Sequence, residues 1–190
     1  MRVIAGAHKG RRLLQPKGHD LRPTSGRVKE ALFSILGKRT EGARFLDLFA
    51  GTGAIGIEAL SRGAQVAAFV EPTASSLKVL RANVELCGLA VSAKVYGCSV
   101  ETFLRRHQST ERPFDIVFAD PPYHEGVGAS LLSDIARADI IAPGSIVILE
   151  HFTKTSLPSE AGRLALIRQY RYGDTSLSVY NALDARERSS

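Results

Sequence analysis

The sequence lacks the features that mark exported, membrane-spanning or metal-binding proteins. It holds only two cysteines, Cys87 and Cys98, at a spacing that excludes both a disulfide framework and a zinc site. No apolar run approaches the ~20 residues of a membrane-spanning helix, and residues 1–20 contain no apolar signal-peptide stretch. The five histidines show no metal-ligand spacing. We therefore expect a cytoplasmic protein that binds no metal and does not associate with membranes.

What is present is the composition of an ordinary globular protein. Hydrophobic residues make up 44% of the chain and charged residues 23%, which excludes wholesale disorder. A length of 190 residues fits one domain, since a domain usually holds about 100–200 residues. These proportions favour a monomer.

Positive charge is concentrated at the front of the chain. The net charge is +6, but residues 1–44 hold eleven basic and three acidic side chains, a charge of +8. The remaining 146 residues hold 14 basic and 16 acidic ones, a charge of −2. Clustered Lys and Arg supply most of the non-specific affinity of proteins for nucleic acid. A basic front end on a near-neutral body therefore indicates a polyanionic partner, with a merely solubilising surface as the alternative.

Alternating apolar runs and amphipathic stretches predict an α/β protein. Buried parallel strands are expected at 44–49, 66–70, 93–96, 114–119 and 145–149, with helices at 54–61, 74–86, 100–107 and 128–138. Two further strands, 164–171 and 176–183, flank a short turn and should form an antiparallel hairpin. Repeated β–α units imply a doubly wound, seven-stranded, mostly parallel Rossmann-like sheet that is closed by this hairpin.

The front end is expected to form a small basic extension. Residues 2–6 and 11–14 predict a β-hairpin, and a helix should begin at Thr24 or Ser25 and end near Leu36. Residues 37–42 are polar and turn-rich, which predicts a boundary there. The expected organisation is an extension over 1–42, a main domain over 43–184 and a tail over 185–190.

A glycine-rich loop follows the first strand of the main domain. Gly51, Gly53 and Gly56 match the pattern G-x-G-x-x-G, and Glu71 lies at the end of the next strand. NAD- and FAD-binding domains share this pattern, with the acid on ribose hydroxyls. Asp47 argues against them, because its charge would lie close to a pyrophosphate. S-adenosylmethionine carries an ammonium and a sulfonium group instead, so the loop favours this cofactor. The remaining alternative is purely structural, with glycines for packing and Asp47 as a satisfied polar residue.

A second loop, Asp-Pro-Pro-Tyr at 120–123, leaves the carboxyl end of the strand expected at 114–119. In open α/β sheets ligands bind beyond these strand ends, so both loops are expected to face one crevice. Asp120 and the carbonyl of Pro121 can accept both hydrogens of an exocyclic amine and aim its lone pair at a sulfonium methyl. Pro122 helps to fix the backbone, and Tyr123 can stack on a base that is flipped out or unpaired. An ordinary turn is the alternative for this loop taken alone.

Together these loops resemble those of class I S-adenosylmethionine-dependent amino-methyltransferases. The resemblance narrows to the RsmD family, bacterial 16S rRNA (guanine-N2)-methyltransferases, and it covers essentially the whole chain. The motifs that carry it are Asp-Leu-Phe-Ala-Gly-Thr-Gly (47–53), Asp-Pro-Pro-Tyr (120–123), Arg-Val-Ile-Ala-Gly (2–6), Lys-Gly-Arg (9–11), Leu-Arg-Pro-Thr-Ser-Gly-Arg-Val-Lys-Glu-Ala-Leu-Phe (21–33) and Tyr-Gly-Asp-Thr-Ser-Leu (172–177).

The resemblance implies a role for each part of the site. The cofactor residues would be Asp47, Phe49, Ala50, Gly51 and Gly53, with Glu71 on the ribose. Residues 120–123 would hold the guanine N2, and small-subunit rRNA would be bound by Lys9, Arg11, Arg12, Arg22, Thr24 and Arg27. Related methyltransferases often place Asp or Asn after the third strand to bind adenine. This chain departs from that pattern with Tyr-Gly-Cys-Ser at 96–99, so Ser99 is the candidate there.

Two other functions stay open on the sequence. The Asp-Pro-Pro-Tyr loop determines the kind of nucleophile and not the polymer, so methylation of a DNA adenine or cytosine amine is the first alternative. The second is an RNA-binding ribosome assembly factor with a degenerate methyltransferase fold. The intact carboxylates Asp47, Glu71 and Asp120 argue against that second alternative.

Overall fold

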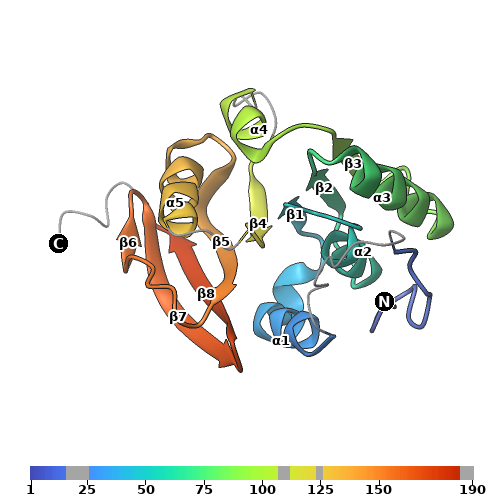
Figure 1. The fold of residues 1–190 in the computed structure, drawn as a ribbon, viewed down its shortest axis with the longest axis horizontal. Coiled ribbons are helices and arrows are strands. Elements are labelled where there is room, and N and C mark those ends of the chain that lie inside the picture. The colour runs from blue at the N-terminus through green and yellow to red at the C-terminus, as the bar shows by residue number, and fades with distance from the viewer. Residues whose placement is uncertain (16–25, 107–111, 123–125, 185–190) are drawn as a thin grey trace. The chain divides into compact units, whose positions relative to one another are not determined.

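A computed structural model describes residues 1–15, 26–106, 112–122 and 126–184. The chain divides into two compact units, Met1–Val100 and Glu101–Ser190 (Figure 1). The described residues contain no helix that is long and apolar enough to cross a membrane. Each unit is an α/β arrangement, as the alternation of apolar strands and amphipathic helices predicts.

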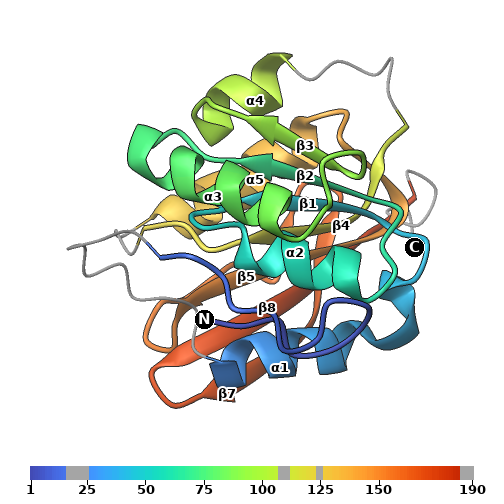
Figure 2. The ribbon, with the colours of Figure 1, turned by 90° about the vertical axis from the view of Figure 1, so that its right-hand side faces the viewer.

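The first unit contains three parallel strands and the helices between them. Its elements are α1 (Gly26–Leu36), the 3-10 helix η1 (Gly37–Thr40), β1 (Arg44–Leu48), α2 (Ala54–Ser61), β2 (Val66–Val70), α3 (Ala74–Leu86) and β3 (Ala93–Tyr96). Strand β2 lies between β1 and β3 and pairs with both in parallel. Figure 2 shows α2 and α3 on the same face of these strands. Most apolar residues of β1 and β2, among them Phe45 and Phe69, are fully buried, as expected for strands covered on both faces.

The expected β-hairpin at residues 2–6 and 11–14 is wrong in its extent. The arm, defined here as residues 1–15, holds only one antiparallel bridge, between Arg2 and Arg12. Backbone bonds do cross the arm: the Val3 N–H donates to the Arg11 carbonyl at 3.0 Å, the Leu13 N–H to the Met1 carbonyl at 3.0 Å and the Gly10 N–H to the Val3 carbonyl at 2.9 Å. The pairing stops at Val3, because the next N–H groups bond to α2. Those of Ile4 and Ala5 donate to the Glu58 carboxylate of α2 rather than to the other half of the arm. The arm is therefore a short hairpin that is also held along α2 (Figure 2), and its pairing does not extend to residue 6.

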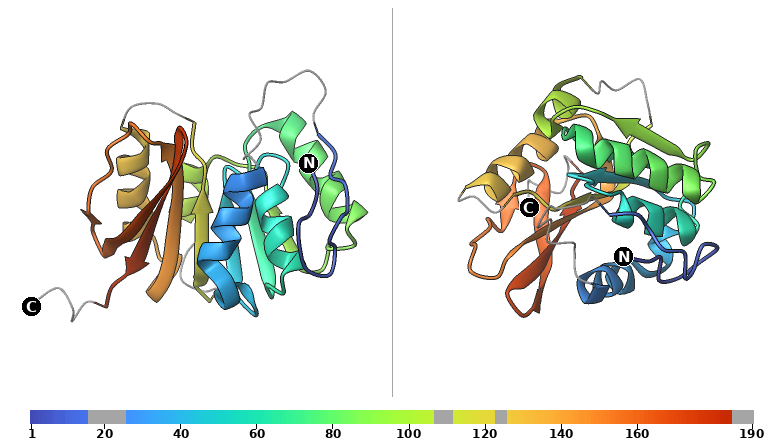
Figure 3. Two further views of the ribbon diagram at one scale, coloured as in Figure 1. Left: turned by 90° about the horizontal axis from the view of Figure 1, so that it is seen from below. Right: turned by 45° about the vertical axis from the view of Figure 1, so that its right-hand side comes forward.

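The second unit is dominated by a mixed sheet of five strands. After α4 (Val100–Arg106), which begins at the boundary, come β4 (Phe114–Ala119), α5 (Val127–Arg137), β5 (Ile141–Phe152), β6 (Glu160–Ala161), β7 (Leu164–Tyr172) and β8 (Thr175–Ala182). The order is β4-β5-β8-β7-β6, with β4 and β5 parallel and the other pairs antiparallel. Helix α5 packs against β5 and β6. Figure 3 shows β4 in yellow and the strands from β5 to β8 in orange to red.

The expected terminal hairpin is confirmed as β7 and β8, but the strand count differs and β5 extends beyond the expected range at both ends. The described residues hold eight strands instead of seven, because the two-residue β6 pairs with the start of β7. Strand β5 runs well beyond the expected 145–149, since its pairing with β8 continues to Phe152 opposite Thr175. The polar residues Glu150 and His151 interrupt the apolar run in the sequence, so the run alone predicts a strand that ends at residue 149. The proposed boundary at residue 42 stays a prediction.

His151 is a buried histidine on β5 whose ring is held neutral. Its Nδ1 lies 2.8 Å from the carbonyl oxygen of Phe152, which can only accept a hydrogen bond, so Nδ1 carries the proton. Its Nε2 lies 2.8 Å from Ser178 Oγ and 3.2 Å from Gln169 Nε2, and it accepts from these groups. Burial lowers the pKa of His151, and the hydrogen bond to Phe152 opposes this only in part.

We expect this lowered pKa to make the protein less stable in acid. Unfolded His151 takes up a proton as pH falls below about 6.5, whereas the folded state resists protonation. The unfolding free energy should therefore fall with decreasing pH, by up to about 1.4 kcal/mol per pH unit from this residue. Urea unfolding between pH 5 and pH 8 measures the slope. His151→Gln should show a shallower slope, and equal slopes in the two proteins would contradict the expectation.

Candidate functional site

The glycine loop between β1 and α2 has an unusual backbone. Phe49, Gly51 and Gly53 have φ values of 62°, 54° and 78°, and a non-glycine residue such as Phe49 adopts this conformation at a cost that is typical of functional loops. A Cβ on Gly56 would lie 2.3 Å from the ring of Phe69, so this glycine allows α2 to pack on β2. A Cβ on Gly51 would meet nothing within 4 Å. The loop thus exposes backbone to open space at Gly51, as a bound cofactor requires.

Glu71 ties the glycine loop to the next helix. Its Oε2 accepts a hydrogen bond from the Gly51 N–H at 2.9 Å, and its Oε1 accepts one from the Thr73 N–H at 2.8 Å, at the start of α3. The side chain is buried at 6% exposure. Because each carboxylate oxygen can accept more than one hydrogen bond, the residue can also receive ribose hydroxyls. Its role as a cofactor ligand stays a prediction.

Asp47 has a structural contact that the motif alone did not reveal. Its Oδ2 accepts a hydrogen bond of 2.9 Å from the Gly56 N–H in the first turn of α2, and the residue is only 1% exposed. A carboxylate in this position satisfies an otherwise unpaired amide and interacts favourably with the helix dipole. Asp47 therefore shapes the loop, and contact with a cofactor ammonium group stays a prediction.

The remaining cofactor candidates differ in their exposure. Ala50 is nearly buried, and its N–H donates to the Val70 carbonyl at 3.0 Å. Ser99 is exposed and directly precedes α4. Ala50 could contact a cofactor through its backbone and Ser99 through its side chain. Both contacts stay predictions.

The Asp-Pro-Pro segment leaves the carboxyl end of β4 in the second unit. The strand is buried and pairs in parallel with β5, so that Ala119 lies opposite Leu149. Asp120 is half-buried, Pro121 is buried and Pro122 is exposed. Tyr123 lies outside the described residues. The location of Asp120 at a strand end agrees with the expectation, and its role on a substrate amine stays a prediction.

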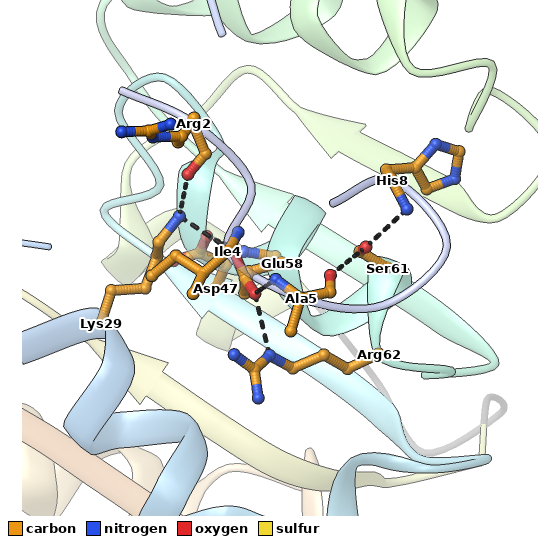
Figure 4. Close-up of polar contacts among 10 residues, drawn as sticks. Arg2, Ile4, Ala5, His8, Lys29, Asp47, Glu58, Ser61 and Arg62 are labelled. Atoms are coloured by element: carbon orange, nitrogen blue, oxygen red, sulfur yellow. Dashed lines mark hydrogen bonds and ion pairs between the residues drawn. The ribbon is translucent and has the colours of Figure 1, made fainter. Parts of the chain in front are cut away.

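The arm is fastened to α2 by a buried carboxylate that the motifs did not reveal. Glu58 Oε2 accepts the Ile4 N–H at 2.8 Å and lies 3.0 Å from Lys29 Nζ, while Oε1 accepts the Ala5 N–H at 3.0 Å and Arg62 Nε at 2.9 Å (Figure 4). Burial raises the pKa of Glu58, but the Ile4 hydrogen bond and the charges of Lys29 and Arg62 outweigh it and lower the pKa. Glu58 is therefore charged, and it anchors the arm.

A second set of contacts holds the arm at the end of α2. Ser61 Oγ donates to the Ala5 carbonyl at 2.5 Å and accepts the His8 N–H at 3.0 Å, and the Ser61 carbonyl accepts the Ala7 N–H at 2.8 Å (Figure 4). Gly6 packs so closely here that a Cβ would lie 1.7 Å from the Ser61 carbonyl oxygen. One sequence signal could have indicated these contacts: Glu58 is a charged residue in an otherwise apolar helix, and such residues are seldom buried without a partner.

The basic residues expected to bind RNA are mostly at the surface. Lys9, Arg11, Arg12 and Arg27 are exposed, whereas Arg22 and Thr24 lie outside the described residues. Arg11 also has an internal contact, because its Nη1 donates to the Leu86 carbonyl at the end of α3 at 2.7 Å. Within the described residues no group of three or more His, Cys, Asp or Glu could hold a metal ion.

Alternating strands and helices, with a glycine loop after β1 and an Asp-Pro-Pro segment after β4, are typical of α/β methyltransferases. The chain belongs to the family described as Conserved hypothetical protein 95, whose sequence model matches residues 1–181. This confirms the resemblance seen in the motifs.

Named relatives agree with this assignment. The "Putative rRNA methyltransferase YlbH" of Bacillus subtilis (strain 168) is 37% identical over 180 residues, covering 95% of this chain and 98% of that protein. The "Ribosomal RNA small subunit methyltransferase D" of Escherichia coli (strain K12) is 32% identical over 180 residues, covering 95% of this chain and 89% of that protein. A solved structure titled "Putative methyltransferase yhhF from Escherichia coli" matches with a TM-score of 0.84 and 32% identity, covering 96% of this chain and 98% of that one. These matches confirm the predicted fold class.

Proposed function

We propose that this protein transfers a methyl group from S-adenosylmethionine to the exocyclic N2 amine of a guanine in 16S rRNA of the small ribosomal subunit. The observation that carries this proposal is the near full-length match to a ribosomal RNA small subunit methyltransferase D. The open backbone at Gly51 and the carboxylate Glu71 beneath it support a cofactor at the glycine loop. The basic arm supports an RNA substrate.

In this proposal the chain's residues hold and orient the two reactants. The cofactor supplies an electrophilic methyl group on a sulfonium. Glu71 receives the ribose hydroxyls, and the backbone from Phe49 to Gly53 lies against the methionine part. The Asp120 carboxylate and the Pro121 carbonyl accept the two N2 hydrogens, so that the nitrogen lone pair points at the methyl group. Methyl transfer would form the N–C bond and break the S–C bond, so that S-adenosylhomocysteine would leave, and the Asp120 carboxylate that accepts an N2 hydrogen would take up the proton that the nitrogen loses.

We also propose that the protein acts as a monomer in the cytoplasm. A chain of 190 residues is ordinary for one catalytic domain, and the small ribosomal subunit is a cytoplasmic substrate.

Transfer of tritiated methyl from S-adenosylmethionine tests the proposal. Purified small subunits, naked 16S rRNA and DNA are offered separately, and the labelled nucleoside is identified after digestion. We expect label in N2-methylguanosine from the ribosomal substrates. Label in DNA alone would favour the DNA amino-methyltransferase, and RNA binding with no transfer to any substrate would favour the assembly factor.

Reversing the charge of Arg11 and Arg12 should weaken RNA binding and reduce its dependence on salt. Each lost phosphate contact is expected to lower the slope of log K against log salt by about 0.7–0.9. Filter binding over a range of salt concentrations measures both. Arg12→Glu alone separates this effect from the Arg11 contact with Leu86.

The matched control is the reversal of Arg105 and Arg106, two adjacent exposed arginines at the end of α4. This control should leave the slope unchanged. An unchanged slope in the arm variants would show that the arm does not contact the phosphates of the RNA.

A further inference from the structure

Asn83 is a fully buried side chain of α3 that bonds both the arm and the glycine loop. Its Oδ1 accepts the Leu14 N–H at 2.7 Å, and its Nδ2 donates to the Leu14 carbonyl at 3.2 Å. The same Nδ2 donates to the Thr52 carbonyl at 3.0 Å, in the middle of the glycine loop. Both amide hydrogens and the amide oxygen are thus used. Leu14 and Thr52 are far apart in the sequence, and one amide holds them together.

The arm and the glycine loop both favour the same orientation of this amide. Leu14 presents an N–H and a carbonyl side by side, and only one orientation of the Asn83 amide satisfies both. That orientation also directs Nδ2 at the Thr52 carbonyl. In the reversed orientation the amide oxygen would face two carbonyl oxygens, which is repulsive. The two Leu14 bonds hold the Asn83 side chain at the place from which Nδ2 reaches Thr52, so the hydrogen bond to the glycine loop is weakened when the arm is displaced.

Thr52 lies in the part of the glycine loop where a ligand would bind, so its hydrogen bond to Asn83 affects the binding surface. Thr52 lies between Gly51 and Gly53, both at positive φ, and Gly51 borders open space. The Thr52–Gly53 peptide plane, whose carbonyl Asn83 holds, is therefore part of the backbone that a cofactor would approach. If that plane tilts, the neighbouring Gly51 N–H and its bond to Glu71 move with it.

We propose that Asn83 is a positioning residue that makes cofactor affinity depend on the seating of the arm. The inference rests on the proposed function, because the cofactor is taken to bind at the glycine loop. It adds a role for the arm that is separate from phosphate contact. By linkage, RNA that stabilises the seated arm raises cofactor affinity, and the cofactor raises RNA affinity by the same factor.

Leu14→Pro tests this proposal through the backbone alone. Proline has no N–H, so the bond to Asn83 Oδ1 is lost, and the Leu14 side chain is 51% exposed and thus of little structural consequence. Leu14→Ala is the matched control, because it removes the same side chain and keeps the N–H. Isothermal titration of each full-length protein with S-adenosylmethionine, without RNA, gives the dissociation constants. We expect the proline variant to bind at least about fivefold more weakly than the alanine variant, within the usual range of coupling between sites.

A spectroscopic readout tests the link to the loop independently of cofactor binding. The Gly53 amide shares a peptide bond with the Thr52 carbonyl, so its NMR resonance should shift in Leu14→Pro and not in Leu14→Ala. Thermal unfolding midpoints show whether each variant is folded at the temperature of measurement. If the proline variant does not fold, Gly6→Ala displaces the arm at Ser61 and should weaken cofactor binding in the same direction.

The outcomes separate the inference from the proposed function. Equal dissociation constants and equal Gly53 resonances in the folded proline and alanine variants would overturn the inference, and so would unchanged values in Gly6→Ala if it replaces the proline variant. If the wild-type protein does not bind S-adenosylmethionine, the proposed cofactor is wrong. The Gly53 resonance would then still show whether the arm positions the loop.

Discussion

Asp120→Ala should reduce methyl transfer by on the order of 10²–10³-fold, the loss seen when one pre-positioned polar group is removed from an active site. The alanine variant cannot accept a hydrogen bond from the guanine N2. The nitrogen lone pair then stays delocalised into the base and is no longer aimed at the methyl group. Transfer of tritiated methyl to small subunits measures the loss, and titration with S-adenosylmethionine should show unchanged cofactor affinity.

The experiment includes a control variant and a conservative variant, both in the second unit. Asp139→Ala removes an exposed carboxylate in the turn before β5 and should leave the rate unchanged. Asp120→Asn keeps the size of the side chain and one oxygen acceptor, and it should retain part of the activity. Full activity of Asp120→Ala would show that the Asp-Pro-Pro segment is a structural turn and would refute the mechanism.

The second large effect is expected on stability, from Glu58→Ala. Glu58 and Lys29 are 0% and 1% exposed, so removal of the carboxylate leaves a buried ammonium group without its counterion. The Ile4 and Ala5 N–H groups lose their acceptor as well. Breaking a buried ion pair in this way costs about 3–5 kcal/mol. Urea unfolding of the two proteins measures the difference in unfolding free energy.

An exposed ion pair provides the matched control. Asp134 and Arg137 have side chains that are 43% and 75% exposed, and Asp134→Ala should change the unfolding free energy by less than about 1 kcal/mol. The double variant Glu58→Leu with Lys29→Met should recover part of the loss, because it removes both buried charges. A cost below 1 kcal/mol for Glu58→Ala would mean that the arm is not held by this carboxylate.

Much of the fold could be predicted because its signals are local. The bounds of α2, α3, β2, β3 and β4 coincide with the expected ranges, since each element is a continuous apolar run or amphipathic stretch between turn residues. The end of β5 could not be predicted in this way. Glu150 and His151 near its end are polar, and the strand continues through them to Phe152 because β8 pairs with these residues.

The arm shows where local signals fail. Its residues predict a hairpin with strands at 2–6 and 11–14, yet the pairing across the arm stops at Val3. The N–H groups of Ile4 and Ala5 bond instead to a carboxylate more than fifty positions away. Local propensity favours extended backbone there, and the choice of hydrogen-bond partner depends on which helix packs beside it. The same holds for Asp47, whose place in the motif predicts a ligand contact but not its bond to Gly56.

The sequence by itself determined the motifs from which the chemistry is predicted: a glycine loop with two carboxylates, an Asp-Pro-Pro-Tyr loop after a buried strand, and positive charge concentrated in its first residues. Each of these features consists of residues that are neighbours in the sequence. They can be predicted because turn preferences and hydrophobic periodicity depend on neighbouring residues. Only the tertiary structure decided how the arm is held and which groups support the loops. Asn83 gives no signal in the sequence, and the charge of Glu58 among apolar residues does not say which groups it binds. They acquire their roles because packing brings backbone groups from distant positions to buried polar atoms, which must be satisfied where they lie.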